Sequence, residues 1–243
     1  MRSLSAPELI ELWERGLNQH PVERALSMLS ACCAETPQRL ATLSIGQRDK
    51  RLIEVYDRLF GSTIDAFAEC PECSERLEYR MSTGELSVTP SAREEIAEYT
   101  LVADETTLQL RLPNSLDLLA IAQCADTAAA GTTLMKRCVL EASLGGTSIP
   151  VETLSQATLG KASAYLAEAD PQAEILVELT CPACRHRWHV VMDIEIFLWA
   201  KVSALAKRLL REVHILAQAY GWSEADILAL SSIRRQSYLE MAG

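Results

Sequence analysis

Two Cys-Pro-x-Cys motifs lie far apart in this 243-residue chain, and their residue types and spacing indicate metal chemistry. They are Cys70-Pro-Glu-Cys73 and Cys181-Pro-Ala-Cys184. Zn²⁺ binds four thiolates in a tetrahedron, and two short CxxC turns supply that set without forcing the backbone. We therefore expect Cys70, Cys73, Cys181 and Cys184 to bind one zinc ion per chain.

The residues that flank the two motifs also correspond, as though one unit occurred twice. Apolar residues alternate before the first cysteine and after the second, which is typical of strands packed on one face. The corresponding positions are Ile64, Ala66 and Ala68 with Ile175, Val177 and Leu179, and Leu77, Tyr79 and Met81 with Trp188, Val190 and Met192. The pattern predicts two β-hairpins, 62–82 and 173–192, which form one split four-cysteine zinc ribbon.

Four sulfur ligands would leave no open coordination position, and catalytic zinc needs one to activate water. The predicted site is therefore structural. His186 and His189 are alternative ligands beside the second motif. A redox dithiol is a further alternative, but such a CxxC opens a helix, whereas strand-like residues follow both pairs here. The remaining cysteines fall in apolar, helix-like segments, where free cysteine acts as a small hydrophobe; they are Cys32, Cys33, Cys124 and Cys138.

The amino-acid composition excludes several classes of function. With 49% apolar residues the chain can fill a core, and its net charge of −10 disfavours a broad grip on a phosphate backbone. The sequence shows no Gly-x-Ser-x-Gly elbow and no P-loop, so we expect neither an enzyme nor a small-molecule substrate. We also expect no signal peptide and no membrane span. A reducing cytoplasm then favours metal binding over disulfides.

The sequence predicts a mainly helical α+β protein in which the two hairpins separate three other regions. The N-terminal region, 1–61, is helical, with starts near Ser5, Pro21 and Pro37 and an end at Gly61.

The inserted α/β region, 83–172, follows the first hairpin. It is expected to begin with a polar linker over 82–94 and to continue with a strand hairpin that turns at Asp104-Glu105. A helix capped by Asn114 or Ser115 follows, then a helical segment broken at Gly145-Gly146, and a helix over about 151–168.

The C-terminal region, 193–243, holds one long helix that ends at Gly221 and two short helices. The apolar stripe of the long helix needs a partner surface. Packing against the N-terminal helices is one explanation, and an exposed docking face is the other.

Several segments together resemble a family from phage-type contractile tails and related injection systems. The family comprises baseplate proteins, or T4-type baseplate hub assembly chaperones. The resembling segments are Ser44 to Gly61, the CPEC motif, Leu110 to Ala122, Ala169 to Trp188 and Arg211 to Met241. The C-terminal signature consists of His214, Ala217, Tyr220, Gly221, Trp222, Ser223, Glu224, Arg234, Arg235, Tyr238 and Leu239.

The resemblance implies a bacterial or phage protein of the cytoplasm that joins the baseplate or helps to assemble it. It implies other baseplate, hub or spike proteins as partners, and it transfers no catalytic residue. The alternative function is a zinc-ribbon nucleic-acid accessory or regulatory protein, with Arg185, Arg187 and His189 near phosphate. The acidic first hairpin weakens that alternative; its glutamates are Glu69, Glu72, Glu75 and Glu78.

Overall fold

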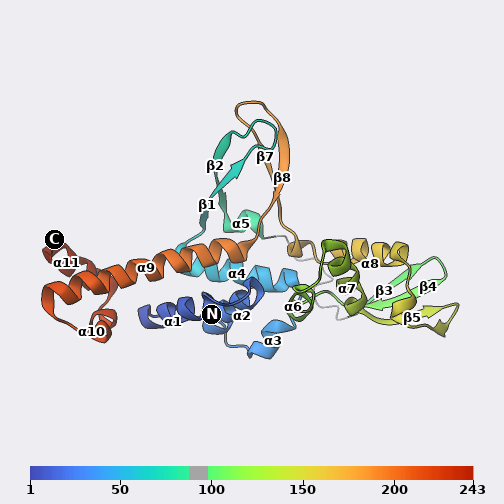
Figure 1. Ribbon diagram of the computed structural model, residues 1–243, viewed down its shortest axis with the longest axis horizontal. Helices are drawn as coiled ribbons and strands as arrows, with labels where there is room; N and C mark the ends of the chain where they lie inside the picture. The colour runs from blue at the N-terminus through green and yellow to red at the C-terminus, as the bar shows by residue number, and fades with distance from the viewer. Residues whose placement is uncertain (88–97, 243) are drawn as a thin grey trace.

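The computed structural model of the chain describes residues 1–87 and 98–242. Helices form an elongated body along the long axis of the molecule (Figure 1). The two predicted hairpins rise from the middle of this body, a small sheet lies at one end, and the C-terminus lies at the other. Within the described residues, no helix is both long and apolar enough to cross a membrane.

The first three N-terminal helices begin where the sequence predicts, and the fourth ends at Gly61, as predicted. They are α1 (Ala6–Gly16), α2 (Pro21–Cys32), α3 (Pro37–Ala41) and α4 (Ile45–Phe60). At the start of α1, the Ser5 N–H donates to Glu8 Oε2 at 2.9 Å, which satisfies a backbone donor that the helix itself leaves unpaired. Gly61 ends α4 with φ of 86°, a conformation that L side chains rarely adopt.

The long helix α9 (Ile194–Tyr220) packs on these N-terminal helices, as the first of the two explanations predicts. One face of α9 is buried, and Leu198 and Val202 join the main core with Leu52 and Tyr56 of α4. α9 ends at Gly221, where the backbone has φ of 69° and the N–H donates to Ala217 O.

A second core lies at the C-terminal end of α9. There α1 packs against α9 and α10 (Glu224–Ala229), and α11 (Ser232–Ala242) folds back along α9. Arg235 of α11 is buried and donates to Glu212 Oε2 of α9 at 2.9 Å. This unit is built from both ends of the chain.

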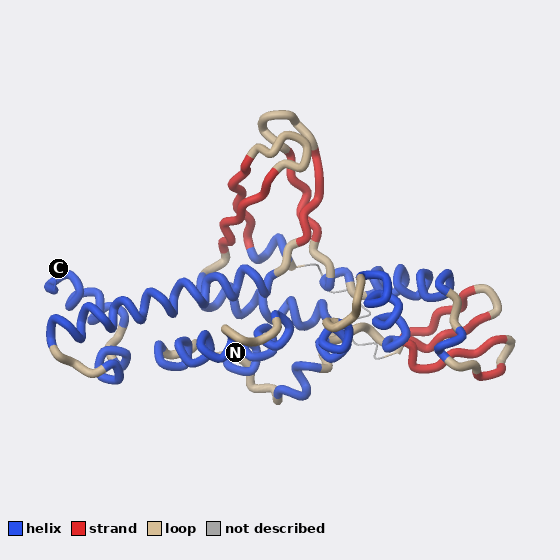
Figure 2. The backbone as a smooth tube through the Cα atoms, in the orientation of Figure 1, coloured by secondary structure: helices blue, strands red, loops and turns tan. Residues whose placement is uncertain are grey.

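The inserted region forms a four-stranded antiparallel sheet with helices beside it (Figure 2). Its elements are α5 (Thr83–Leu86), β3 (Tyr99–Ala103), β4 (Thr106–Leu110), α6 (Ser115–Ile121), α7 (Thr127–Cys138), β5 (Val139–Leu144), β6 (Thr147–Ser148), the 3₁₀ turns η1 (Val151–Thr153) and η2 (Pro171–Ala173), and α8 (Gln156–Ala169). The strands about Asp104-Glu105 are confirmed, and residues 88–94 of the expected linker lie outside the described residues.

The prediction at Gly145-Gly146 was wrong. These glycines do not break a helix but form the turn between β5 and β6, with φ of 56° and 83°. The helix already ends at Cys138, and the next residues pair with β4 at the centre of the sheet. The periodicity of apolar residues does not reveal which distant strand a segment will pair with, and here that pairing outweighs the local preference for helix.

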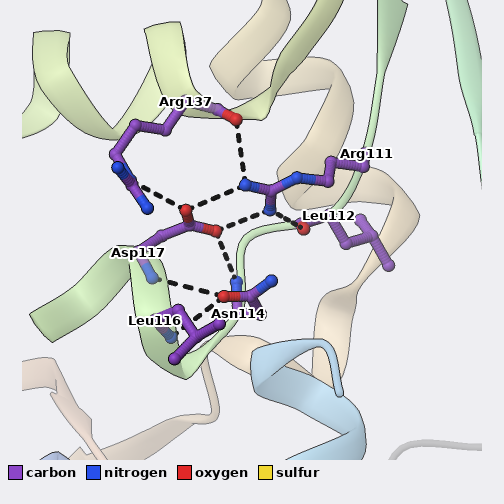
Figure 3. A network of polar contacts seen from close by, with 6 residues as sticks. All are labelled: Arg111, Leu112, Asn114, Leu116, Asp117 and Arg137. Carbon is purple, nitrogen blue, oxygen red and sulfur yellow. Dashed lines mark hydrogen bonds and ion pairs between the residues drawn. The ribbon is translucent and has the colours of Figure 1, made fainter. Parts of the chain in front are cut away.

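A buried carboxylate holds the inserted region together (Figure 3). Asp117 is fully buried and accepts hydrogen bonds from Arg111 at 2.6 and 2.9 Å and from Arg137 at 2.9 Å. It also accepts from the Asn114 N–H, while Asn114 caps α6 in return. Burial raises the pKa of Asp117, but the hydrogen bonds from Arg111, Asn114 and Arg137 outweigh it and leave that pKa lowered.

Two contacts fasten the inserted region to the start of α4. The Gly46 N–H donates to Asp170 Oδ2 at 3.0 Å, and the Ile45 N–H donates to Pro113 O at 3.1 Å. Asp170 lies where α8 ends, so it brings the exit of the inserted region to the N-terminus of α4, where a negative charge is stabilising. A Cβ at Gly46 would overlap with the Asp170 carboxylate, so a larger residue at this position would have to displace that carboxylate.

Candidate metal centre

The four motif cysteines lie at the tips of two antiparallel hairpins. The strands are β1 (Thr63–Glu69) with β2 (Arg76–Ser82), and β7 (Leu176–Thr180) with β8 (Arg187–Val191). The hairpins stand side by side, and both project away from the helical body (Figures 1 and 2). Their matched apolar positions are consistently less exposed than the neighbours on either side, so these positions form the faces that the hairpins turn toward each other.

The two turns have the same backbone geometry. The N–H of the first cysteine donates five residues onward, from Cys70 to Glu75 O and from Cys181 to His186 O, both at 2.9 Å. The residue after the second cysteine donates back to the first, and it is Ser74 in one turn and Arg185 in the other. Ser74 and Arg185 adopt φ of 58° and 63°, which costs about 1 kcal/mol for an L residue.

The repeated left-handed residue was not predicted from the sequence. Its signal is the position directly after each CxxC, where the chain must turn sharply to return as a strand. Both turns accept this cost at the same place, which fits two loops shaped to present sulfur atoms to one point.

The sulfur atoms are spaced as ligands of one metal ion. Cys70 Sγ lies 3.7 Å from Cys184 Sγ, and Cys73 Sγ lies 3.6 Å from Cys181 Sγ. All four sulfur atoms lie within 4.8 Å of one another. A tetrahedron with Zn–S bonds of about 2.3 Å has S–S edges of about 3.8 Å, so the cluster has the dimensions that zinc requires. The thiols are free.

The local electrostatics favour thiolate at part of the cluster. Hydrogen bonds from the backbone of Cys184 and Ala183 lower the pKa of Cys181 to about 7, against the effect of desolvation. At Cys73, a hydrogen bond from the Glu75 backbone lowers the pKa, but the other thiols and desolvation outweigh it and raise that pKa to about 12. Thiolates at this spacing repel one another, and a divalent cation would relieve that repulsion.

The alternative ligands do not join the cluster. His186 instead stacks on Trp188, with ring centroids 6.0 Å apart, and His189 is exposed on the outer face of its hairpin. Within residues 1–87 and 98–242, one group of side chains is spaced as metal ligands, and it consists of cysteines only. Arg187, expected near phosphate in the alternative function, lies 3.6 Å from Glu178.

The other four cysteines lie apart from the cluster, within helices or beside them. Cys32 and Cys138 are buried, and Cys33 and Cys124 are partly buried. Desolvation raises the pKa of Cys32 and of Cys138 to about 11, so both are neutral thiols at physiological pH. They serve as small core residues, as predicted.

Comparison with known proteins identifies the family. A family model described as T4 bacteriophage base plate protein matches residues 18–199, about three quarters of the chain, and this range includes both cysteine motifs. Residues 211–241, which carry the C-terminal signature, lie outside the matched range. No curated protein and no solved structure matches the chain. The match covers well over half of the sequence, so the chain belongs to the family of T4 bacteriophage base plate proteins.

Proposed function

We propose that this protein is a zinc-stabilised, non-enzymatic component or assembly factor of the baseplate of a contractile phage tail or injection system. The family match over residues 18–199 supports the baseplate role. The sulfur geometry supports the metal: Cys70, Cys73, Cys181 and Cys184 would hold one structural zinc ion per chain.

The position of the cluster explains what the metal would do. The first hairpin follows α4, and the second leads directly into α9, so a metal at the tips would join the two halves of the chain. The hairpins project from the helical body, so their tips lie away from the main core (Figure 1). A zinc ion would keep this projection in one shape for contact with hub or spike proteins. The hub assembly chaperone role is the assembly-factor form of the same proposal.

Elemental analysis of protein purified without added metal tests the zinc site. We expect about one zinc per chain, because four thiolates form a closed structural site. Cys70→Ser and Cys181→Ser should each abolish stoichiometric zinc and lower the unfolding midpoint. Cys124→Ser is the matched control, since Cys124 is a free cysteine outside the cluster, and it should retain zinc. Four freely titratable thiols and substoichiometric zinc in the native protein would disprove the site.

The baseplate role has a separate test. Deletion of the gene should prevent the assembly of complete contractile particles, and complementation should restore it. Mass spectrometry of purified particles then separates the two forms of the proposal, since a permanent subunit stays in the particle and a chaperone does not. Normal particles assembled in the absence of this protein would refute both forms.

Nucleic-acid binding is the competing function, and the exposed Arg185 on the second hairpin is the feature that favours it. Such binding would weaken steeply with salt, because it depends on phosphate contacts. We expect no binding to DNA or RNA at low salt, measured by fluorescence anisotropy. Salt-dependent binding near micromolar affinity would favour the competing function.

A further inference from the structure

α9 has a second, uncovered face opposite the one that packs on the body. The residues of this open face recur at spacings of four and three over five turns, and every one of them is exposed; they are Ile196, Ala200, Ala204, Lys207, Arg211 and Ile215. Alanine at the centre leaves the helix backbone accessible, and isoleucine lies toward each end. Such a face lets another surface approach closely.

This face is basic in an acidic protein. Residues 196–218 contain four Lys or Arg and one acidic residue, although the whole chain has a net charge of −10. The single acid, Glu212, already pairs with Arg208 and Arg235. Within the described part of the chain, Lys201, Lys207 and Arg211 form no ion pair. The open face therefore offers unpaired positive charge.

The outer face of the first hairpin has the opposite character. Residues 62–82, the two strands with the turn between them, contain five acidic and two basic side chains, and the basic ones, Arg76 and Arg80, lie opposite Glu69 and Asp65 in the strand register. Asp65 pairs with Arg80, but the glutamates form no ion pair with any described residue; they are Glu69, Glu72, Glu75 and Glu78. Phe67 lies among them, opposite Glu78 in the strand register, and 76% of it is exposed. An exposed aromatic ring surrounded by charge is typical of an interface anchor.

Within one chain these two complementary surfaces do not meet. The tip of the first hairpin rises well away from α9, and no ion pair joins residues 62–82 to α9 (Figure 1). We propose that the open face of α9 binds the outer face of the first hairpin of a second copy of this chain. Phe67 would pack on Ala200 and Ala204, and Glu72 and Glu78 would face Lys207 and Arg211.

The contact joins two different surfaces, so it is heterologous. Each copy would offer its hairpin to one neighbour and α9 to the other, which gives a ring if the rotation closes and a filament if it does not. The contact is small and strongly charged, so we expect an affinity of about 1–100 µM that weakens with salt.

Sedimentation velocity on the zinc-loaded protein tests the proposal. The protein should associate with rising concentration at low ionic strength, and added salt should weaken this. Phe67→Ser should raise the dissociation constant at least about tenfold, as expected for loss of an aromatic anchor. The double variants Lys207→Glu/Arg211→Glu and Glu72→Lys/Glu78→Lys should each be monomeric, because each places like charges across the contact.

Mixing the two double variants gives the decisive result. In an equimolar mixture, every contact between the two different variants joins opposite charges, so association should return. Arg15→Glu/Arg39→Glu is the matched control: it reverses two exposed cations outside both surfaces and should associate like the unaltered protein. Zinc content and circular dichroism verify that each variant is folded. Monomers at about 100 µM and low salt, or no recovery on mixing, would overturn the proposal.

Discussion

Two glycines in helices should respond in opposite ways to the same substitution, alanine. At Gly46 a Cβ would overlap with the carboxylate of Asp170, which accepts the Gly46 N–H at 3.0 Å. At Gly160, within α8, a Cβ would meet no atom within 4 Å. The first substitution must displace the carboxylate that fastens the inserted region to α4, whereas the second only changes helix propensity.

The magnitudes follow from these contacts. Loss of a hydrogen bond to a charged group costs about 1.5–3 kcal/mol. Replacement of glycine by alanine in a helix returns up to about 1 kcal/mol. Gly46→Ala should therefore destabilise the protein by about 1–2 kcal/mol, and Gly160→Ala should stabilise it by about 0.5–1 kcal/mol.

Urea unfolding of the purified protein, followed by circular dichroism, measures both effects. Asp170→Ala provides a second background, because it removes the carboxylate with which the new Cβ collides. In that background Gly46→Ala should become neutral or stabilising, so the double-mutant cycle should show a coupling of at least about 1 kcal/mol. If Gly46→Ala stabilises the unaltered protein as much as Gly160→Ala does, the close approach at α4 is refuted.

Two further predictions concern buried carboxylates. Asp117→Asn should destabilise the protein by about 3 kcal/mol, because it leaves Arg111 and Arg137 without their shared carboxylate. This value is the lower end of the range for breaking a buried ion pair, since both arginines are partly exposed to solvent. An unchanged urea midpoint would contradict this. At Asp49, burial raises the pKa to about 6 against the effect of Arg48, so the folded protein holds this proton more tightly than the unfolded chain. Stability should fall as pH rises from about 4 to about 6, and Asp49→Asn should flatten that slope in unfolding curves.

The parts that sequence predicts well are those whose signal is local. Each cysteine motif and its alternating flanks lie within 18 residues, 64–81 and 175–192, and they locate both hairpins. Helix ends are local as well: Glu8, three residues after Ser5, accepts the Ser5 N–H at the start of α1, and Gly221 adopts the left-handed conformation that ends α9. One further argument predicts that the two motifs meet in space: a structural zinc ion binds four ligands, and each motif supplies two.

Contacts between distant residues could not be predicted in this way. The Gly46–Asp170 contact spans 124 residues, and nothing in the residues around Gly46 indicates what will approach it. β5 was mistaken for helix because its first residues continue the apolar pattern of α7, and its true partner is β4. The charge network about Asp117 also depends on Arg137, which folding brings from 20 residues away.

The separation of the two hairpins has a consequence during synthesis of the chain. Cys73 and Cys181 meet in the folded protein, although they are 108 positions apart in the sequence. A ribosome that adds about 5–20 residues per second needs roughly 5–20 s to cover that distance. Throughout this interval the first pair of thiols would be only half of the proposed site and could not enclose a zinc ion with four ligands. Metal capture would then mark the moment at which the inserted region has been completed and the two hairpins have met.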